Sequence, residues 1–191
     1  MLAACGNGAW DAADGSGNPA RPVDTTPQVI PVADPSQPVA SGNTPAAADA
    51  AALAALNAQF DPARDPAKDL QTAIVEAKRG GRRIILNIGG EWCPWCHIMD
   101  SFIDENSDIR RFRDANYVWV KVNYSDENKN TDFLSQYPEI EGYPHLFVLD
   151  ADGQLLHSQF TGDLEKGKSY DYDKFFMFLK EWAPLREDTE T

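Results

Sequence analysis

Two cysteines three positions apart, Cys93 and Cys96, are the residues of this sequence best suited to covalent chemistry. An apolar run, residues 84–88, leads towards them, and two consecutive glycines interrupt that run. The residues that follow Cys93 have the hydrophobic spacing of a helix. The pair therefore lies where a predicted strand gives way to a predicted helix.

This placement gives the two thiols different chemistry. Cys93 falls in the first turn of the predicted helix, where unpaired amide N–H groups carry the positive end of the helix dipole. These groups stabilise a thiolate, and the thiolate is the nucleophile of disulfide exchange. Cys96 lies one turn further on the same face, so it can attack a mixed disulfide at Cys93 and release it. The residues thus favour thiol–disulfide exchange.

Three other uses of the motif remain open at this point. Together with His97 it has the C-x-x-C-H pattern of c-type haem attachment, although it continues a buried strand and no apolar haem pocket is evident. A zinc site needs about four ligands. The two cysteines, His97 and His145 supply that number, but neighbouring ligands on one helical turn are awkward. A purely structural disulfide between Cys93 and Cys96 closes too short a ring to constrain much of the unfolded chain.

Further residues give the motif the features of a known family. Trp92 precedes it, and about fifty residues downstream Gly142-Tyr143-Pro144 forms a turn before another apolar run. With these features, residues 61–185 resemble the thioredoxin superfamily, whose active-site box matches residues 91–96. The resemblance implies an α/β thioredoxin fold, with a central mixed sheet flanked by helices.

The resemblance also implies roles for individual residues. Cys93 would attack or be attacked, Cys96 would resolve the mixed disulfide, and their disulfide would be the only redox group, with no metal and no other cofactor. Pro144 matches the family's cis-proline that faces the cysteines, so the backbone of Tyr143 would pair with an extended client strand. The residues expected to contact clients are Trp92, Pro94, Trp95, Tyr143 and Pro144, and Trp92 is also expected to shield Cys96.

One position departs from the family. Six residues before the first cysteine, thioredoxins carry a buried aspartate that relays a proton to the resolving thiol, and this chain has Asn87 there. An amide forms hydrogen bonds but does not take up a proton at neutral pH. Lys121 matches the lysine that pairs with that aspartate. The relay is therefore either lost or performed by another group, for which Glu91 and His97 are candidates.

Composition narrows the classes of partner. The 191-residue chain carries a net charge of −13, which would repel the phosphates of nucleic acids and anionic lipids. It contains no run of eighteen apolar residues, so no transmembrane helix is predicted. We expect a monomer that acts on protein thiols or disulfides.

The start of the chain suggests an anchor. Leu2-Ala3-Ala4-Cys5 resembles the end of a bacterial lipoprotein signal, in which the cysteine is lipidated, although the basic and apolar regions of a signal are missing before it. The alternative is a free cysteine in a disordered tail. Lipidation of Cys5 would attach the protein to a membrane in the bacterial periplasm or cell envelope, where a membrane protein could supply electrons.

The chain divides into four predicted segments. Residues 1–44 are rich in proline, alanine and glycine, and we expect a disordered tether. Residues 45–60 are predicted to form an alanine-rich helix, which either docks weakly on the domain or acts as a spacer. Residues 61–186 are predicted to form the thioredoxin-like domain, and residues 187–191 a disordered tail. Within the domain we expect helices at 66–78, 93–106, 108–114, 131–137 and 172–182, and strands at 82–88, 117–122, 145–150 and 154–160.

The sequence thus predicts a membrane-tethered thiol–disulfide oxidoreductase outside the bacterial cytoplasm. Reduction of client disulfides is favoured over oxidation, because nothing beyond Pro94 points to a strong oxidant. A reductase in an oxidising compartment would need an electron donor at the membrane. The alternative is a non-catalytic module that uses the same fold to bind clients or a metal.

Overall fold

The computed structural model describes residues 45–185, with side chains from residue 49 onwards. The predictions for Cys5, for the tether at 1–44 and for the tail at 187–191 lie outside these residues. Within the described part of the chain, no helix is long and apolar enough to cross a membrane.

A four-stranded mixed sheet forms the centre of the fold, with the strand order β2-β1-β3-β4. β1 (Arg83–Gly89) is parallel to β2 (Tyr117–Asn123), and β3 (His145–Leu149) is antiparallel to both β1 and β4 (Leu155–Phe160). The apolar run in β1 predicts burial on both faces, and every residue of β2 is buried as well.

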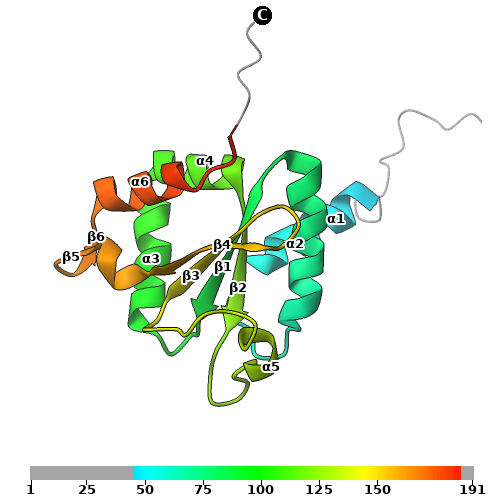
Figure 1. The fold of residues 1–191 in the computed structure, drawn as a ribbon, viewed down its shortest axis with the longest axis horizontal. Coiled ribbons are helices and arrows are strands. Elements are labelled where there is room, and N and C mark those ends of the chain that lie inside the picture. Colours follow the sequence, from blue (N-terminus) through cyan, green and yellow to red (C-terminus); the bar gives the residue numbers. More distant parts are fainter. Residues whose placement is uncertain (1–44, 186–191) are drawn as a thin grey trace, which may run out of the picture. The chain divides into compact units, whose positions relative to one another are not determined.

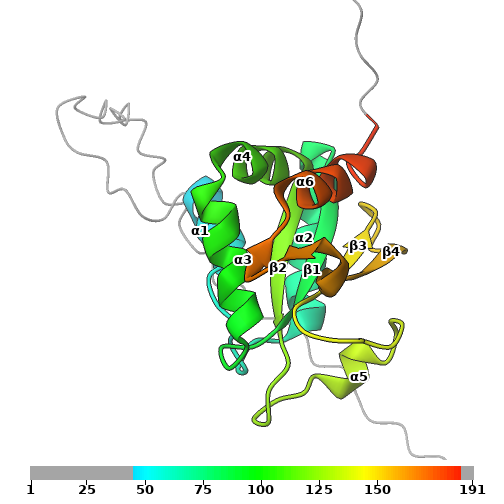
Figure 2. The ribbon, with the colours of Figure 1, turned by 90° about the vertical axis from the view of Figure 1, so that its left-hand side faces the viewer.

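Helices cover both faces of the sheet. α1 (Pro45–Leu56) and α2 (Pro66–Gly80) lie on one face, and α3 (Pro94–Glu105) and α6 (Tyr172–Glu181) lie on the other (Figure 1). Figure 2, turned by 90°, shows α3 in front of the sheet. The shorter elements are α4 (Ser107–Asn116), α5 (Thr131–Leu134), a 3₁₀ turn (Thr161–Leu164) and the two-residue strands β5 (Glu165–Lys166) and β6 (Ser169–Tyr170).

Local sequence signals set the ends of α2. The Asp65 carboxylate accepts hydrogen bonds from the backbone N–H groups of Ala67 and Lys68, which satisfies donors that the first turn leaves free. Gly81 ends the helix with a φ of 60°, a left-handed conformation that glycine adopts without steric cost.

The alternation of side chains along β1 divides the core into two layers. Ile84, Leu86 and Ile88 pack with α1 and α2, whereas Ile85 packs with α3 and α6. Because side chains on a strand alternate between faces, Asn87 and Gly89 lie on the same face as Ile85, beneath α3. The active-site helix therefore rests on the odd-numbered positions of β1.

Several elements differ from the prediction. α1 ends at Leu56 rather than at position 60, and it is docked, because Leu56 and Phe60 are both buried in the domain. α5 is four residues long, and α4 begins at Ser107, one residue before the predicted start. The 3₁₀ turn and the β5–β6 hairpin were not predicted, because short irregular elements lack a hydrophobic period.

Candidate active site

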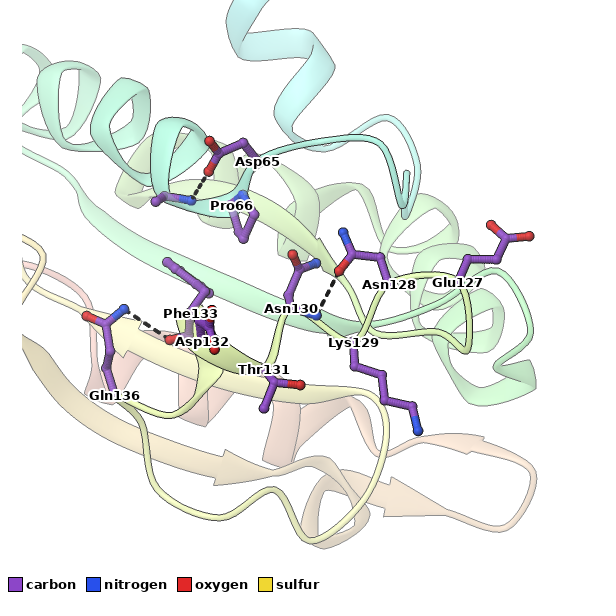
Figure 3. Close-up of a pocket in the computed structure, with 11 residues that line it drawn as sticks. Asp65, Pro66, Glu127, Asn128, Lys129, Asn130, Thr131, Asp132, Phe133 and Gln136 are labelled. Carbon is purple, nitrogen blue, oxygen red and sulfur yellow. Dashed lines mark hydrogen bonds between the residues drawn. The ribbon is translucent and has the colours of Figure 1, made fainter.

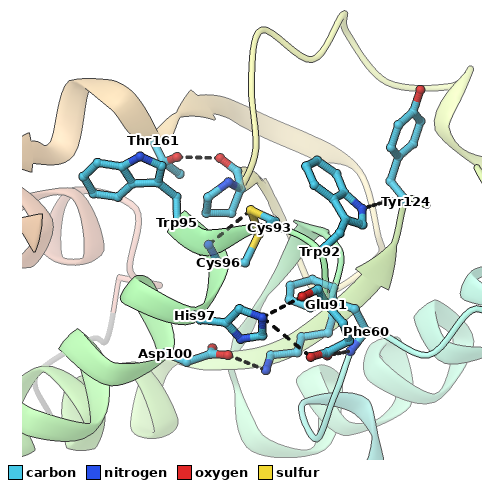
Figure 4. Close-up of a disulfide and its surroundings, with 12 residues drawn as sticks. Phe60, Glu91, Trp92, Cys93, Trp95, Cys96, His97, Asp100, Tyr124 and Thr161 are labelled. Carbon is cyan, nitrogen blue, oxygen red and sulfur yellow. Dashed lines mark hydrogen bonds and ion pairs between the residues drawn. A yellow bond between two sulfur atoms is a disulfide. The ribbon is translucent and has the colours of Figure 1, made fainter. Parts of the chain in front are cut away.

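Cys93 and Cys96 form a disulfide at the start of α3 (Figure 4). Cys93 is the residue at the N-cap, and its sulfur accepts a hydrogen bond of 3.2 Å from the backbone N–H of Cys96. This amide is among the helix donors that the sequence analysis expected near the sulfur. Both cysteines are buried, with exposed fractions of 2% for Cys93 and 0% for Cys96.

Gly89, the last residue of β1, makes room for the second sulfur. A Cβ atom at this position would lie 2.5 Å from the Sγ of Cys96, closer than any real contact of this kind. Only glycine therefore allows β1 to pass directly beneath the disulfide.

An aromatic wall borders the disulfide. The Trp92 indole N–H donates a 2.7 Å hydrogen bond to the backbone oxygen of Tyr124, and the Trp92 ring meets the Tyr143 ring edge-on at 5.5 Å. Tyr143 stacks on Tyr124 at 4.9 Å and packs against the buried cysteines. Trp92 remains 54% exposed. The aromatic residue buried in one cluster with the two cysteines is Phe60.

The peptide bond between Tyr143 and Pro144 is cis. The carbonyl oxygen of Pro144 accepts a hydrogen bond from the hydroxyl of Thr161, a buried residue that the sequence analysis did not identify. Nearby, the Trp95 ring packs edge-on against Tyr170 at 5.6 Å. The unpredicted segment after β4 thus supports two of the residues expected to contact clients, whereas Pro94 is exposed at the first position of α3.

Glu91 and His97 lie together on the outer side of the active-site loop. The His97 Nε2 is 2.8 Å from the backbone oxygen of Glu91 and 3.8 Å from its carboxylate. The other carboxylate oxygen of Glu91 accepts a 2.8 Å hydrogen bond from the backbone N–H of Phe60. Both side chains are about half exposed, so this pair borders the site on the solvent side.

The polar residues beneath the disulfide are arranged differently from the thioredoxin pattern. Asn87 is fully buried, and neither polar atom of its side chain has a hydrogen-bond partner. Lys121 is its neighbour on β2, but the Lys121 ammonium donates a 2.8 Å hydrogen bond to the carboxylate of Asp100 on α3. Asp100 was not among the residues predicted for the site. The available signal was its position four residues after Cys96, which places both on one helix face.

Comparison with known families and structures agrees with this geometry. Residues 65–151 match the thioredoxin-like family model. Disulfide bond reductase DsbH of Chlamydia pneumoniae is 29% identical over 44% of this chain and 55% of that protein. Thiol:disulfide interchange protein DsbD of Pseudomonas sp. (strain JR1 / K1) is 26% identical over 67% of this chain and 20% of that protein. The chain therefore spans only part of the curated relatives that it matches.

A solved structure shares the thioredoxin-like architecture. The disulphide isomerase of Xylella fastidiosa Temecula1 superposes with a TM-score of 0.56 at 19% identity, over 64% of this chain and 94% of that one. Together with the strand order β2-β1-β3-β4, this likeness shows that the chain has the α/β thioredoxin fold.

His145 does not join the cysteines. It lies on the face of β3 that packs towards α2, with its ring 4.8 Å from Phe147, and its Nε2 is 2.8 Å from the Ser158 hydroxyl. Burial, with a smaller contribution from the positive charge of His157, lowers the pKa of His145 to about 4. Within residues 45–185, no three His, Cys, Asp or Glu side chains are grouped as metal ligands would be.

A separate hollow of about 660 Å³ lies between the start of α2 and the loop before α5 (Figure 3). Most of its lining residues are polar, among them Asn128, Asn130 and Gln136, and the first two are hydrogen-bonded to each other. No cysteine lines it, so it lies outside the redox site.

Proposed function

We propose that this protein is a thiol–disulfide oxidoreductase in which Cys93 exchanges with client proteins and Cys96 resolves the mixed disulfide. The observation that carries the proposal is the Cys93–Cys96 disulfide at the start of α3, packed against Tyr143. The family match over residues 65–151 and the names of the relatives support the same chemistry.

In the reducing direction, the Cys93 thiolate attacks one sulfur of a client disulfide. A bond forms between Cys93 and that sulfur, and the second client sulfur leaves as a thiolate that takes up a proton from solvent. Cys96 then loses its proton and attacks the Cys93 sulfur, which releases the other client thiol. Two electrons have passed from the protein to the client, and the Cys93–Cys96 disulfide remains.

The client would bind as an extended strand beside the backbone of Tyr143. The indole rings of Trp92 and Trp95 lie on the two sides of the disulfide in Figure 4, so they would contact the residues that flank the client cysteine. Pro94 and Pro144 would complete this contact surface. The protein would act as a monomer, with no metal and no cofactor other than its own disulfide.

We further propose that the protein reduces disulfides, since one relative is named a disulfide bond reductase, and that it acts in the bacterial periplasm or cell envelope. Lipidated Cys5 would hold it on a membrane, where a membrane protein would return the two electrons. Replacement of Cys5 by serine, with expression from the gene with its native signal, should release the protein into the soluble fraction. A variant that stays in the membrane pellet would contradict the lipid anchor.

Two measurements test the enzymatic function. The protein should accelerate the reduction of insulin by dithiothreitol, whereas a module that only binds clients or a metal would not. Equilibration with glutathione buffers should give a potential near that of thioredoxin, about −270 mV, if the protein is a reductase. A value near about −120 mV, typical of the strong oxidant DsbA, would contradict the reducing direction.

A further inference from the structure

A hollow of about 370 Å³ lies next to the loop that carries Glu91 and Trp92. Phe60 and Pro62 line another part of it, and the remaining lining comes from residues between 123 and 127. Within this lining, Phe60 is the residue that is also buried against Cys93 and Cys96. The ring of Phe60 therefore borders the hollow on one side and the two buried sulfurs on the other.

The Phe60 ring and the Cys96 sulfur are close neighbours. A Cβ atom built on Gly89 would lie 2.5 Å from the Cys96 Sγ and 3.1 Å from the Cζ of Phe60. The Cys96 sulfur and the Phe60 ring therefore both lie against Gly89. Phe60 is only 2% exposed, so the ring fills the space between the hollow and Cys96.

Three contacts hold Phe60 and the residues that follow it in place. The backbone N–H of Phe60 donates a 2.8 Å hydrogen bond to the Glu91 carboxylate. The Lys121 ammonium lies 5.1 Å from the centre of the ring, within the range of a cation–π interaction. Two residues further on, the backbone oxygen of Pro62 accepts a 2.8 Å hydrogen bond from the side chain of Asn128. A segment that precedes the thioredoxin-like match at 65–151 is therefore fastened to the active-site loop.

We propose that Phe60 is a positioning residue that determines which cysteine reacts with thiols from outside. Its ring closes the approach to Cys96 from the hollow, so that an incoming thiolate reaches only Cys93. In the oxidised protein, the thiolate then bonds to the Cys93 sulfur, the disulfide breaks, and Cys96 leaves as the thiolate. This inference rests on the proposed exchange reaction.

The accessibility of Cys96 is measured without any exchange reaction. In the full chain with Cys5→Ser and Cys93→Ser, Cys96 is the only thiol, and its alkylation by iodoacetamide is followed from pH 6 to 10. The rate at high pH reports access to the thiolate, separately from the pH midpoint. Phe60→Ala should raise this limiting rate at least tenfold, Phe60→Val should raise it less, and Phe60→Leu should stay within about twofold of the parent.

Leu56→Ala is the matched control, because Leu56 is equally buried but belongs to the core layer on the α1 and α2 side. Its limiting rate should match that of the parent. If Phe60→Ala fails to fold, as judged by circular dichroism, the comparison of the valine and leucine variants decides. Equal limiting rates for the parent and all folded Phe60 variants would overturn the inference, and so would an equal increase in Leu56→Ala.

The position of attack is tested with both active-site cysteines present. The oxidised Cys5→Ser protein is treated with glutathione, quenched with acid, and mapped by mass spectrometry. Glutathione should be found on Cys93 in the parent and on both cysteines in Phe60→Ala. Attachment to Cys93 alone in Phe60→Ala would overturn the inference. The two proposals can fail separately. If the parent does not exchange with protein clients, but the limiting alkylation rates of Cys96 still differ among the Phe60 variants as expected, the proposed function is refuted and the role of Phe60 in covering Cys96 stands.

Discussion

The ammonium group of Lys121 lies 2.8 Å from a carboxylate oxygen of Asp100, one helical turn after Cys96. In thioredoxins, the matching lysine pairs with an aspartate at the position of Asn87. Here β1 offers a neutral amide at that position, and the carboxylate comes from α3 instead. The charged pair beneath the active-site helix is thus present, but its acid belongs to a different element.

This pair should control the ionisation of Cys96 in the reduced protein. Asp100→Asn leaves the positive charge of Lys121 unbalanced, so it should move the pH midpoint of Cys96 alkylation down by roughly one unit. Lys121→Met leaves the carboxylate unbalanced and should move the midpoint up. Asp104→Asn serves as the control, because Asp104 lies on the exposed side of the same helix. Shifts of the same sign in the two variants would show that the pair does not act on Cys96 through its charge.

The roles of the two cysteines predict different trapping behaviour. Cys96→Ala should accumulate mixed disulfides with client proteins, because the bond at Cys93 no longer meets a resolving thiol. Cys93→Ala should accumulate none. Non-reducing gels of cell extracts that express each variant measure the difference, and equal trapping by both variants would contradict the assignment of Cys93 as the attacking residue.

The buried, unpartnered amide of Asn87 makes this position sensitive to a carboxyl group. Asn87→Asp places an acid without a full set of partners in the core, which should cost about 1–3 kcal/mol of unfolding free energy. Burial raises the pKa of such a carboxyl, while Lys121 opposes the rise. The variant should melt at a lower temperature, yet resolve mixed disulfides faster near neutral pH, because the new group exchanges protons with Cys96.

Single-turnover resolution of a mixed disulfide at Cys93, followed from pH 5 to 9, measures this effect. Overlapping pH profiles for the wild type and Asn87→Asp would mean that residue 87 does not exchange protons with Cys96. Asn87→Ser is a useful companion variant, because it stays polar but introduces no carboxyl group. It should leave the profile unchanged.

His145 should make stability depend on pH in acid. Its pKa falls from an ordinary value of 6.5 to about 4 because the ring is buried. Between these values the unfolded chain binds a proton that the folded protein does not, so stability is lost as the pH falls from 6.5 to 4. Over this window, the wild-type melting temperature should fall by roughly 5 °C more than that of His145→Gln. His97→Gln, which changes a half-exposed imidazole, should behave like the wild type.

The sequence by itself determined the features whose causes are local. The cysteine spacing and the strand-to-helix change placed the disulfide at the start of α3, and Asp65 and Gly81 fixed the ends of α2. The apolar run at 84–88 and the β-branched and aromatic residues at 117–122 predicted two strands, and the structure confirms both. In each case the physical cause acts between residues a few positions apart, so the pattern is visible along the chain.

Tertiary structure alone decided which distant residues surround the disulfide. Phe60 comes to Cys96 from a segment that follows α1, and the carboxylate that pairs with Lys121 comes from Asp100 of α3. Thr161 reaches Pro144 through an irregular segment with no hydrophobic period. These contacts depend on how α3, the loop after α1 and the turn after β4 pack on one sheet. Packing is a property of the folded chain as a whole, so no local pattern records it.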